Sequence, residues 1–124
     1  MTLREKQSHF ARLLGELICW IYSHPGWAIT LADGGVTLNR KVELPNGAVM
    51  HAVDREHMRG SLHYERLSQD FNLFVDGKWI VNASHPAWQA VGAHWKGLDG
   101  EAAWGGDFAS GDANHVSLRY GGRE

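Results

Sequence analysis

The sequence predicts an α+β fold, with a small antiparallel sheet, an N-terminal helix and a second helix in one domain spanning residues 1–124. Two observations predict it: a long helical apolar stripe near the N-terminus, and a strand–turn–strand pattern followed by a second helical pattern in the second half. The length suits a single core. A composition of 44% hydrophobic and 21% charged residues is typical of a globular domain.

The first predicted element is a helix that begins after Thr2, because Thr2 and Glu5 have capping-box spacing. The segment "HPG" at 24–26 ends it. The single cysteine, Cys19, lies in the apolar part of this helix, so we expect a buried thiol, and it cannot form an internal disulfide. The apolar stripe has helical spacing and consists of Phe10, Leu13, Leu14, Leu17, Ile18 and Ile21.

A short strand, "WAITLADGG", follows and runs into a Gly-Gly turn. Residues 33–60 carry no clear period. Within them, "NRKVELPNGAVMHAV" predicts a small hairpin around Pro45–Asn46–Gly47, and "AVDREHMRG" predicts a short helical turn.

The strongest strand signal is "RLSQDFNLFVDGKWIV", in which two strand-like runs flank Asp76–Gly77, a pair that favours a type I′ turn. A second helix is predicted from Pro86 to Lys96, with Gly97 capping its end. The segments "AAWGGDF" and "HVSLRY" predict two further strands joined by the turn-forming loop "ASGDAN".

Composition excludes several classes of function. The net charge of −2 provides no basic field for binding nucleic acid. No apolar run approaches the roughly 20 residues of a membrane span, so we expect no membrane insertion. The N-terminal segment lacks the apolar core of a signal peptide. We therefore expect a protein made in the cytoplasm, which would need another factor to reach a target outside. We also expect a monomer.

Four polar side chains form the pattern that could carry chemistry. His63 precedes a strand on which Asp70 lies on the polar face, and Asp112 and His115 lie three apart in a turn entering the last strand. Two histidines and a carboxylate are the ligand set of many catalytic zinc sites, and a further carboxylate can act as the base. Spacing alone leaves a structural interpretation open, in which His63 is a surface residue and Asp112 forms an Asx turn.

At these residues the chain resembles the M15 zinc peptidases, a group of D-alanyl-D-alanine carboxypeptidases and L-alanyl-D-glutamate endopeptidases. The stretch "GSLHYERLSQDFNLF" is similar to their S-x-H-x6-D motif, especially in short phage-encoded members. The stretch "WGGDFASGDANHVSLRYGGR" is similar to their closing segment. The resemblance is good over residues 58–123 and weak over residues 1–57.

The resemblance implies a zinc cofactor held by His63, Asp70 and His115, with Asp112 as general base. Its members cleave peptide bonds in the stem peptide of bacterial peptidoglycan. The function implied is therefore that of a zinc metallopeptidase acting as a bacteriolytic phage endolysin, which would leave the host cytoplasm with the help of a holin and degrade the cell wall. The scissile bond stays open between an endopeptidase and a D-Ala-D-Ala carboxypeptidase.

One departure concerns substrate binding. Family members usually carry Tyr-Arg after the strand that matches "WAITLAD", whereas residues 34–36 here read "GGV". Arg40 or Arg59 could take the role of that arginine, with Arg55 a further candidate. If none does, the alternative is a non-catalytic peptidoglycan-binding or virion structural module that retains the zinc fold.

Three further residues near the motifs have two interpretations each. Ser61 could bond within the site or stabilise a loop, and Trp104 could line a substrate groove or pack in the core. Asp107 could orient a zinc-binding histidine or serve as a structural carboxylate of the turn.

Overall fold

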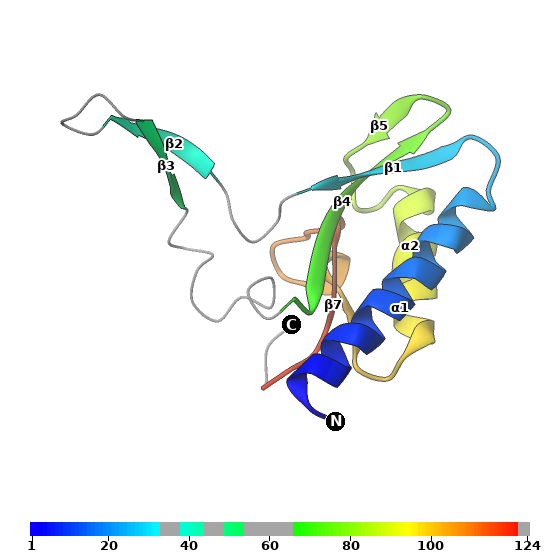
Figure 1. The fold of residues 1–124 in the computed structure, drawn as a ribbon. Helices are drawn as coiled ribbons and strands as arrows, with labels where there is room; N and C mark the ends of the chain where they lie inside the picture. Colours follow the sequence, from blue (N-terminus) through cyan, green and yellow to red (C-terminus); the bar gives the residue numbers. More distant parts are fainter. Residues whose placement is uncertain (33–37, 44–48, 54–65, 122–124) are drawn as a thin grey trace.

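The computed structural model describes residues 1–32, 38–43, 49–53 and 66–121, and for 38–43 and 49–53 it describes only the backbone. It confirms the α+β class, with two helices and a small antiparallel sheet among these residues (Figure 1). The elements are α1 (Leu3–Tyr22), β1 (Trp27–Ala32), β2 (Leu38–Glu43), β3 (Val49–Val53), β4 (Ser68–Val75), β5 (Lys78–Ile80), α2 (Pro86–Leu98), β6 (Ala102–Trp104), the 3-10 helix η1 (Gly105–Asp107) and β7 (His115–Leu118).

Strand β4 is the centre of the main sheet, whose order is β1-β4-β7-β6, with β5 also paired to β4. All of these pairings are antiparallel. One edge of β4 pairs with β1 along six positions. Along the other edge its first three residues pair with β7 and its last three with β5. The β2–β3 pair forms a separate antiparallel two-stranded sheet, as the hairpin prediction requires. The predicted turn around Pro45–Asn46–Gly47 lies outside the described residues.

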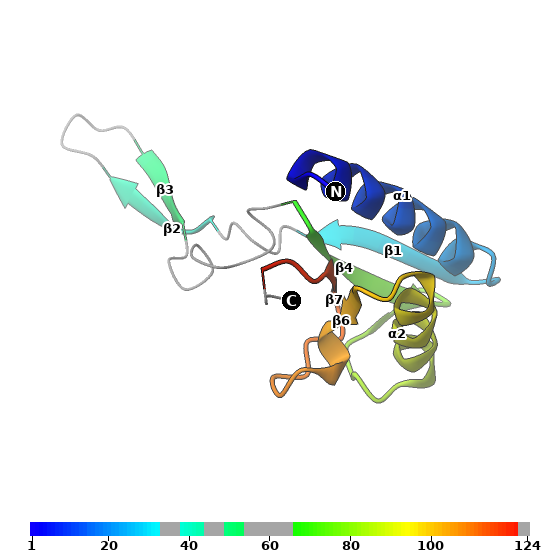
Figure 2. The ribbon, with the colours of Figure 1, turned by 90° about the horizontal axis from the view of Figure 1, so that it is seen from below.

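The helices bury one face of the sheet, as the two ribbon views show (Figures 1 and 2). Alternation along β4 directs Phe71 and Leu73, which are 1% and 0% exposed, into the core, while Asp70 and Asn72 lie on the other face. Helix α1 contributes the predicted stripe, of which Phe10, Leu13, Leu17 and Ile21 are buried. Helix α2 contributes Trp88, Val91 and Trp95.

Local sequence signals explain how these elements begin and turn. Thr2 accepts a bond from the Glu5 backbone N–H while the Glu5 side chain accepts one from Thr2 N–H, which forms the predicted capping box. Asp76 and Gly77 both have positive φ, 52° and 79°, as a type I′ turn requires. His85 caps α2, because its Nδ1 accepts the Ala87 N–H at 3.0 Å.

Three expectations are wrong. Helix α2 continues past Gly97 to Leu98, which packs against the core, and Asp99 is its C-cap. The strand predicted over "AAWGGDF" stops at Trp104, since the next three residues form η1. Cys19 is exposed, because a position midway between the buried Leu17 and Ile21 faces away from them on a helix with 3.6 residues per turn.

Candidate metal centre and adjoining pocket

Asp70 and His115 lie side by side on neighbouring strands. The β4–β7 register sets them opposite each other, although they are 45 positions apart in the chain. Asp70 Oδ1 lies 3.0 Å from His115 Nδ1, and the two side chains are 19% and 13% exposed. The Phe108 ring packs beside the imidazole, with 5.5 Å between ring centroids. Strand pairing therefore positions both residues, and the Phe108 ring further restricts the His115 imidazole.

This pair fits two corners of a zinc site. Zinc–ligand bonds of about 2.0–2.2 Å place two donors of a tetrahedron roughly 3.3–3.5 Å apart, and Asp70 Oδ1 and His115 Nδ1 are within a few tenths of an ångström of that separation. The third expected ligand, His63, lies outside the described residues. Within the part of the chain that the structure describes, no group of three or more His, Cys, Asp or Glu side chains could hold a metal ion.

Ser68 adds a polar group to the same face of β4 as Asp70, because the two residues are two positions apart in a strand. It is 7% exposed, and its Oγ has no hydrogen-bond partner among the described residues. A buried hydroxyl without a partner is uncommon in native proteins and points to a water, an ion or a catalytic role nearby. The observation supports a polar ligand close to Asp70.

Asp112 lies in the loop that leads into β7, with its side chain exposed. Its Oδ2 accepts a hydrogen bond from Ser110 Oγ at 2.9 Å. Its backbone carbonyl accepts the His115 N–H at 3.1 Å, so the main chain, rather than the carboxylate, closes the turn onto His115. This turn fixes the two residues relative to each other and leaves the carboxylate exposed to solvent.

Gly105 brings η1 close to this turn. A Cβ at Gly105 would overlap the backbone oxygen of Asp112 and would lie 2.8 Å from Cβ of His115. Glycine is therefore required for η1 to pack directly on the Asp112–His115 turn.

Trp104 is buried beneath the same loop, which agrees with the core interpretation and not with a substrate groove. It is 3% exposed, its ring packs against Gly92 of α2, and its Nε1 donates to Ala113 O at 2.7 Å. Asp107, which the sequence offered as a partner for a zinc-binding histidine, has a lysine partner instead: its Oδ2 lies 2.8 Å from Nζ of Lys96 at the surface.

The remaining predicted residues belong to the part of the chain between β1 and β4. Arg59, Ser61 and His63 lie outside the described residues, as do Arg55 and the "GGV" segment at 34–36. Arg40 belongs to β2, for which the structure describes the backbone alone.

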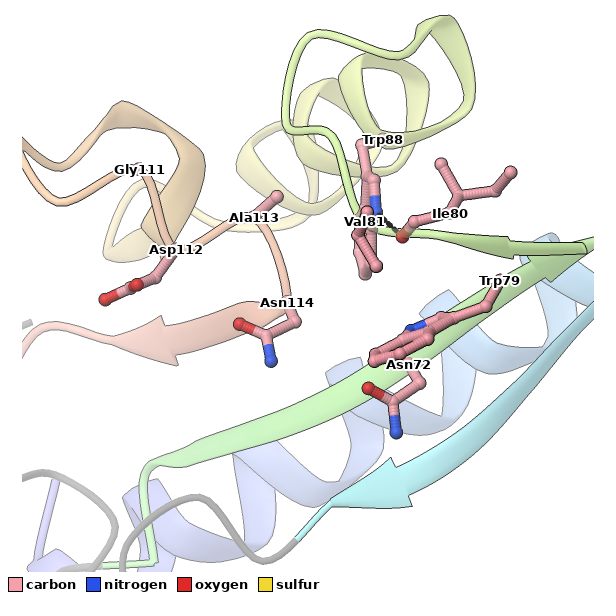
Figure 3. Close-up of a pocket in the computed structure, with 9 residues that line it drawn as sticks. All are labelled: Asn72, Trp79, Ile80, Val81, Trp88, Gly111, Asp112, Ala113 and Asn114. Atoms are coloured by element: carbon pink, nitrogen blue, oxygen red, sulfur yellow. Dashed lines mark hydrogen bonds between the residues drawn. The ribbon is translucent and has the colours of Figure 1, made fainter.

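A pocket of about 210 Å³ adjoins Asp112 (Figure 3). Trp79 in β5 lies opposite Phe74, so it is on the same sheet face as Asp70, and it is 62% exposed. Sequence reasoning did not single out Trp79, although pairing the residues on either side of the two-residue Asp76–Gly77 turn would have placed Trp79 opposite Phe74 and therefore on this face. The described lining consists of Asn72, Trp79, Ile80, Val81, Trp88, Gly111, Asp112, Ala113 and Asn114.

No family model, curated protein or solved structure matches this chain. The resemblance to the M15 peptidases therefore rests on the sequence motifs. Among the described residues, no helix has the length and apolar character needed to cross a membrane.

Proposed function

We propose that this protein is a zinc-dependent peptidase that hydrolyses peptide bonds in the stem peptide of bacterial peptidoglycan, as a phage endolysin does. The observation that carries the proposal is the contact between Asp70 and His115, 3.0 Å apart, with Asp112 in the turn directly before His115. These are the motif residues in the order that the M15 resemblance requires.

In this proposal His63, Asp70 and His115 hold the zinc ion. Bound zinc supplies Lewis-acid chemistry, which acidifies water and polarises a peptide carbonyl. Asp112 acts as general base: its exposed carboxylate accepts a proton from the attacking water and then delivers it to the leaving amine. The bond from Ser110 Oγ to Asp112 Oδ2 leaves Oδ1 for this proton transfer.

The test combines metal analysis with lysis of outer-membrane-permeabilised cells. We expect about one zinc ion per chain, loss of zinc in His115→Ala, and retention of zinc with roughly 10²–10⁴-fold slower lysis in Asp112→Asn. Glu16→Ala, an exposed change on α1, serves as the control for loss of a carboxylate. A wild-type protein without zinc, whose Asp112→Asn variant lyses walls at the wild-type rate, would refute the proposal.

Chelation provides a second test that does not depend on turnover. A metal that binds only the folded state at 100 times its Kd stabilises that state by about 2.7 kcal/mol. We therefore expect a chelator to lower the melting temperature, and His63→Ala to lower it in the same way. Identical melting curves with and without chelator would contradict zinc binding.

The replacement of the family's Tyr-Arg by the "GGV" segment favours one rival, a wall-binding or virion module without catalysis. A zinc-loaded protein that sediments with sacculi but releases no new amino groups would identify that rival. Mass spectrometry of digested muropeptides then separates an endopeptidase, which cuts within the stem, from a carboxypeptidase, which removes terminal D-alanine.

A further inference from the structure

The pocket beside Asp112 has no positive charge among its described lining residues (Figure 3). Asp112 contributes a carboxylate, and Asn72 and Asn114 contribute carboxamides. An anionic group placed there would meet one negative charge and no cationic partner from this lining. Charge complementarity therefore favours a cationic ligand.

Trp79 provides an aromatic surface for such a group. Figure 3 shows its indole extending from β5 toward Asn114, above Asn72. The side chain is 62% exposed, and its neighbour Val81 is 69% exposed. The face of an indole attracts ammonium groups through its quadrupole, and tryptophan is the best of the aromatic residues in this respect.

The amide groups add hydrogen-bond acceptors. Asn72 Nδ2 donates to Thr30 Oγ1 at 3.2 Å, which directs the amide nitrogen of Asn72 toward β1 and leaves its carbonyl oxygen as an acceptor. Asn114 adds a second carboxamide group to the lining of the same pocket. A primary ammonium group has three donors and no acceptor, so it matches this lining.

We infer that this pocket binds a protonated primary amine on a flexible side chain, such as the terminal ammonium of a lysine-like diamino acid in the peptide substrate. The identification of the ligand as part of a substrate rests on the proposed peptidase function. In Figure 3 Asp112 lies at one end of the pocket and Trp79 at the other, with Asn114 between them in this view. The ammonium group binds at the Trp79 end, and the Asp112 end stays open to the scissile bond.

The test uses NMR of the indole N–H groups of the zinc-loaded protein, with Nα-acetyl-lysine amide as the probe and its Nε-acetylated form as the uncharged comparison. Neither probe has a bond between two amino acids to be cleaved. Trp79→Phe assigns the Trp79 signal. We expect the charged probe to shift that signal and the uncharged one to leave it unchanged, with weaker binding at high salt.

Two variants measure the contribution of the indole. Because Trp79 is largely exposed, Trp79→Ala should fold normally and bind the charged probe about two- to fivefold more weakly, the range of an exposed cation–π contact. Leu31→Ala is the matched control: Leu31 is 63% exposed but lies opposite Phe71, on the other face of the sheet. It should bind as the wild type does. Asn72→Asp, which adds a negative charge, should tighten binding.

Equal shifts from both probes, or wild-type affinity in Trp79→Ala, would overturn the inference. A shift of the Trp79 signal by N-acetylglucosamine but not by the lysine probe would also overturn it, in favour of a sugar subsite. If the probe binds as expected but no peptidoglycan bond is cleaved, the inference stands and the proposed peptidase function fails. If walls are cleaved and Trp79→Ala keeps the wild-type preference for free-amine over acetylated stem peptides, the inference alone fails.

Discussion

Replacing Gly105 by alanine tests the packing that holds Asp112 beside His115. The added Cβ would overlap the Asp112 backbone oxygen and lie 2.8 Å from Cβ of His115. Carbon atoms in contact are about 3.5–4.0 Å apart, so η1 and the turn must separate by about 1 Å. Overpacking of this kind costs about 1–3 kcal/mol of folding free energy. A displacement of about 1 Å at a catalytic group can lower activity by about 10²-fold.

The assay measures melting temperature by circular dichroism and the rate of wall lysis on the same samples. For a domain of this size, 1 kcal/mol corresponds to about 4 °C, so we expect Gly105→Ala to melt about 4–12 °C lower. The control is Gly15→Ala in α1, where a Cβ meets nothing within 4 Å and alanine should raise stability by up to about 1 kcal/mol. If Gly105→Ala melts and lyses like the wild type, η1 does not pack on the turn as described.

Three further predictions concern stability. Burial lowers the pKa of His94 below 6.5 in the folded protein, so the folded state loses stability relative to the unfolded state as the pH falls below 6.5. His94→Gln should therefore flatten the dependence of melting temperature on pH between 7 and 5. An unchanged slope would show that His94 does not cause this pH dependence. The hydrogen bond from His9 lowers the pKa of Asp99, so the ionised Asp99 stabilises the folded state above pH 3.8 and this stabilisation is lost at lower pH. Asp99→Asn should therefore reduce the loss of stability on acidification, which melting temperatures measured between pH 2 and 5 would show. Trp104→Phe leaves the Ala113 carbonyl without its donor and should cost about 1–3 kcal/mol in urea unfolding, whereas a midpoint equal to the wild type would mean that the bond contributes nothing.

The elements that sequence reasoning placed correctly depend on interactions between residues close in the chain. The capping box joins Thr2 to Glu5 across three positions, and the type I′ turn needs only the backbone freedom of Asp76 and Gly77. The apolar stripe of α1 and the alternation along β4 likewise repeat at fixed short periods. Such features can be read without knowing what packs on them.

The errors arise where packing outweighs a local preference. Gly97 is a common helix terminator, but Leu98 is held against the core and the helix continues. The "GG" after Trp104 interrupts a strand pattern because Gly105 must pack on the Asp112–His115 turn. In both cases the deciding contact is made with another element of the fold: Leu98 packs against the core, and Gly105 packs on a turn that begins seven positions later.

The sequence by itself determined the helices, the β4–β5 hairpin and the chemical identity of the candidate ligands, since these follow from short-range periods and from a motif. Only the tertiary structure decided that Asp70 meets His115, because the pairing of β4 with β7 brings together two residues that are 45 positions apart in the sequence. It also decided that Trp104 is buried and Trp79 exposed. The physical reason is that the two side chains are chemically identical, so the sequence alone does not say which of them is buried. The packing of other elements decides it: Trp104 packs against Gly92 of α2, whereas Trp79 projects from the exposed face of the β4–β5 hairpin.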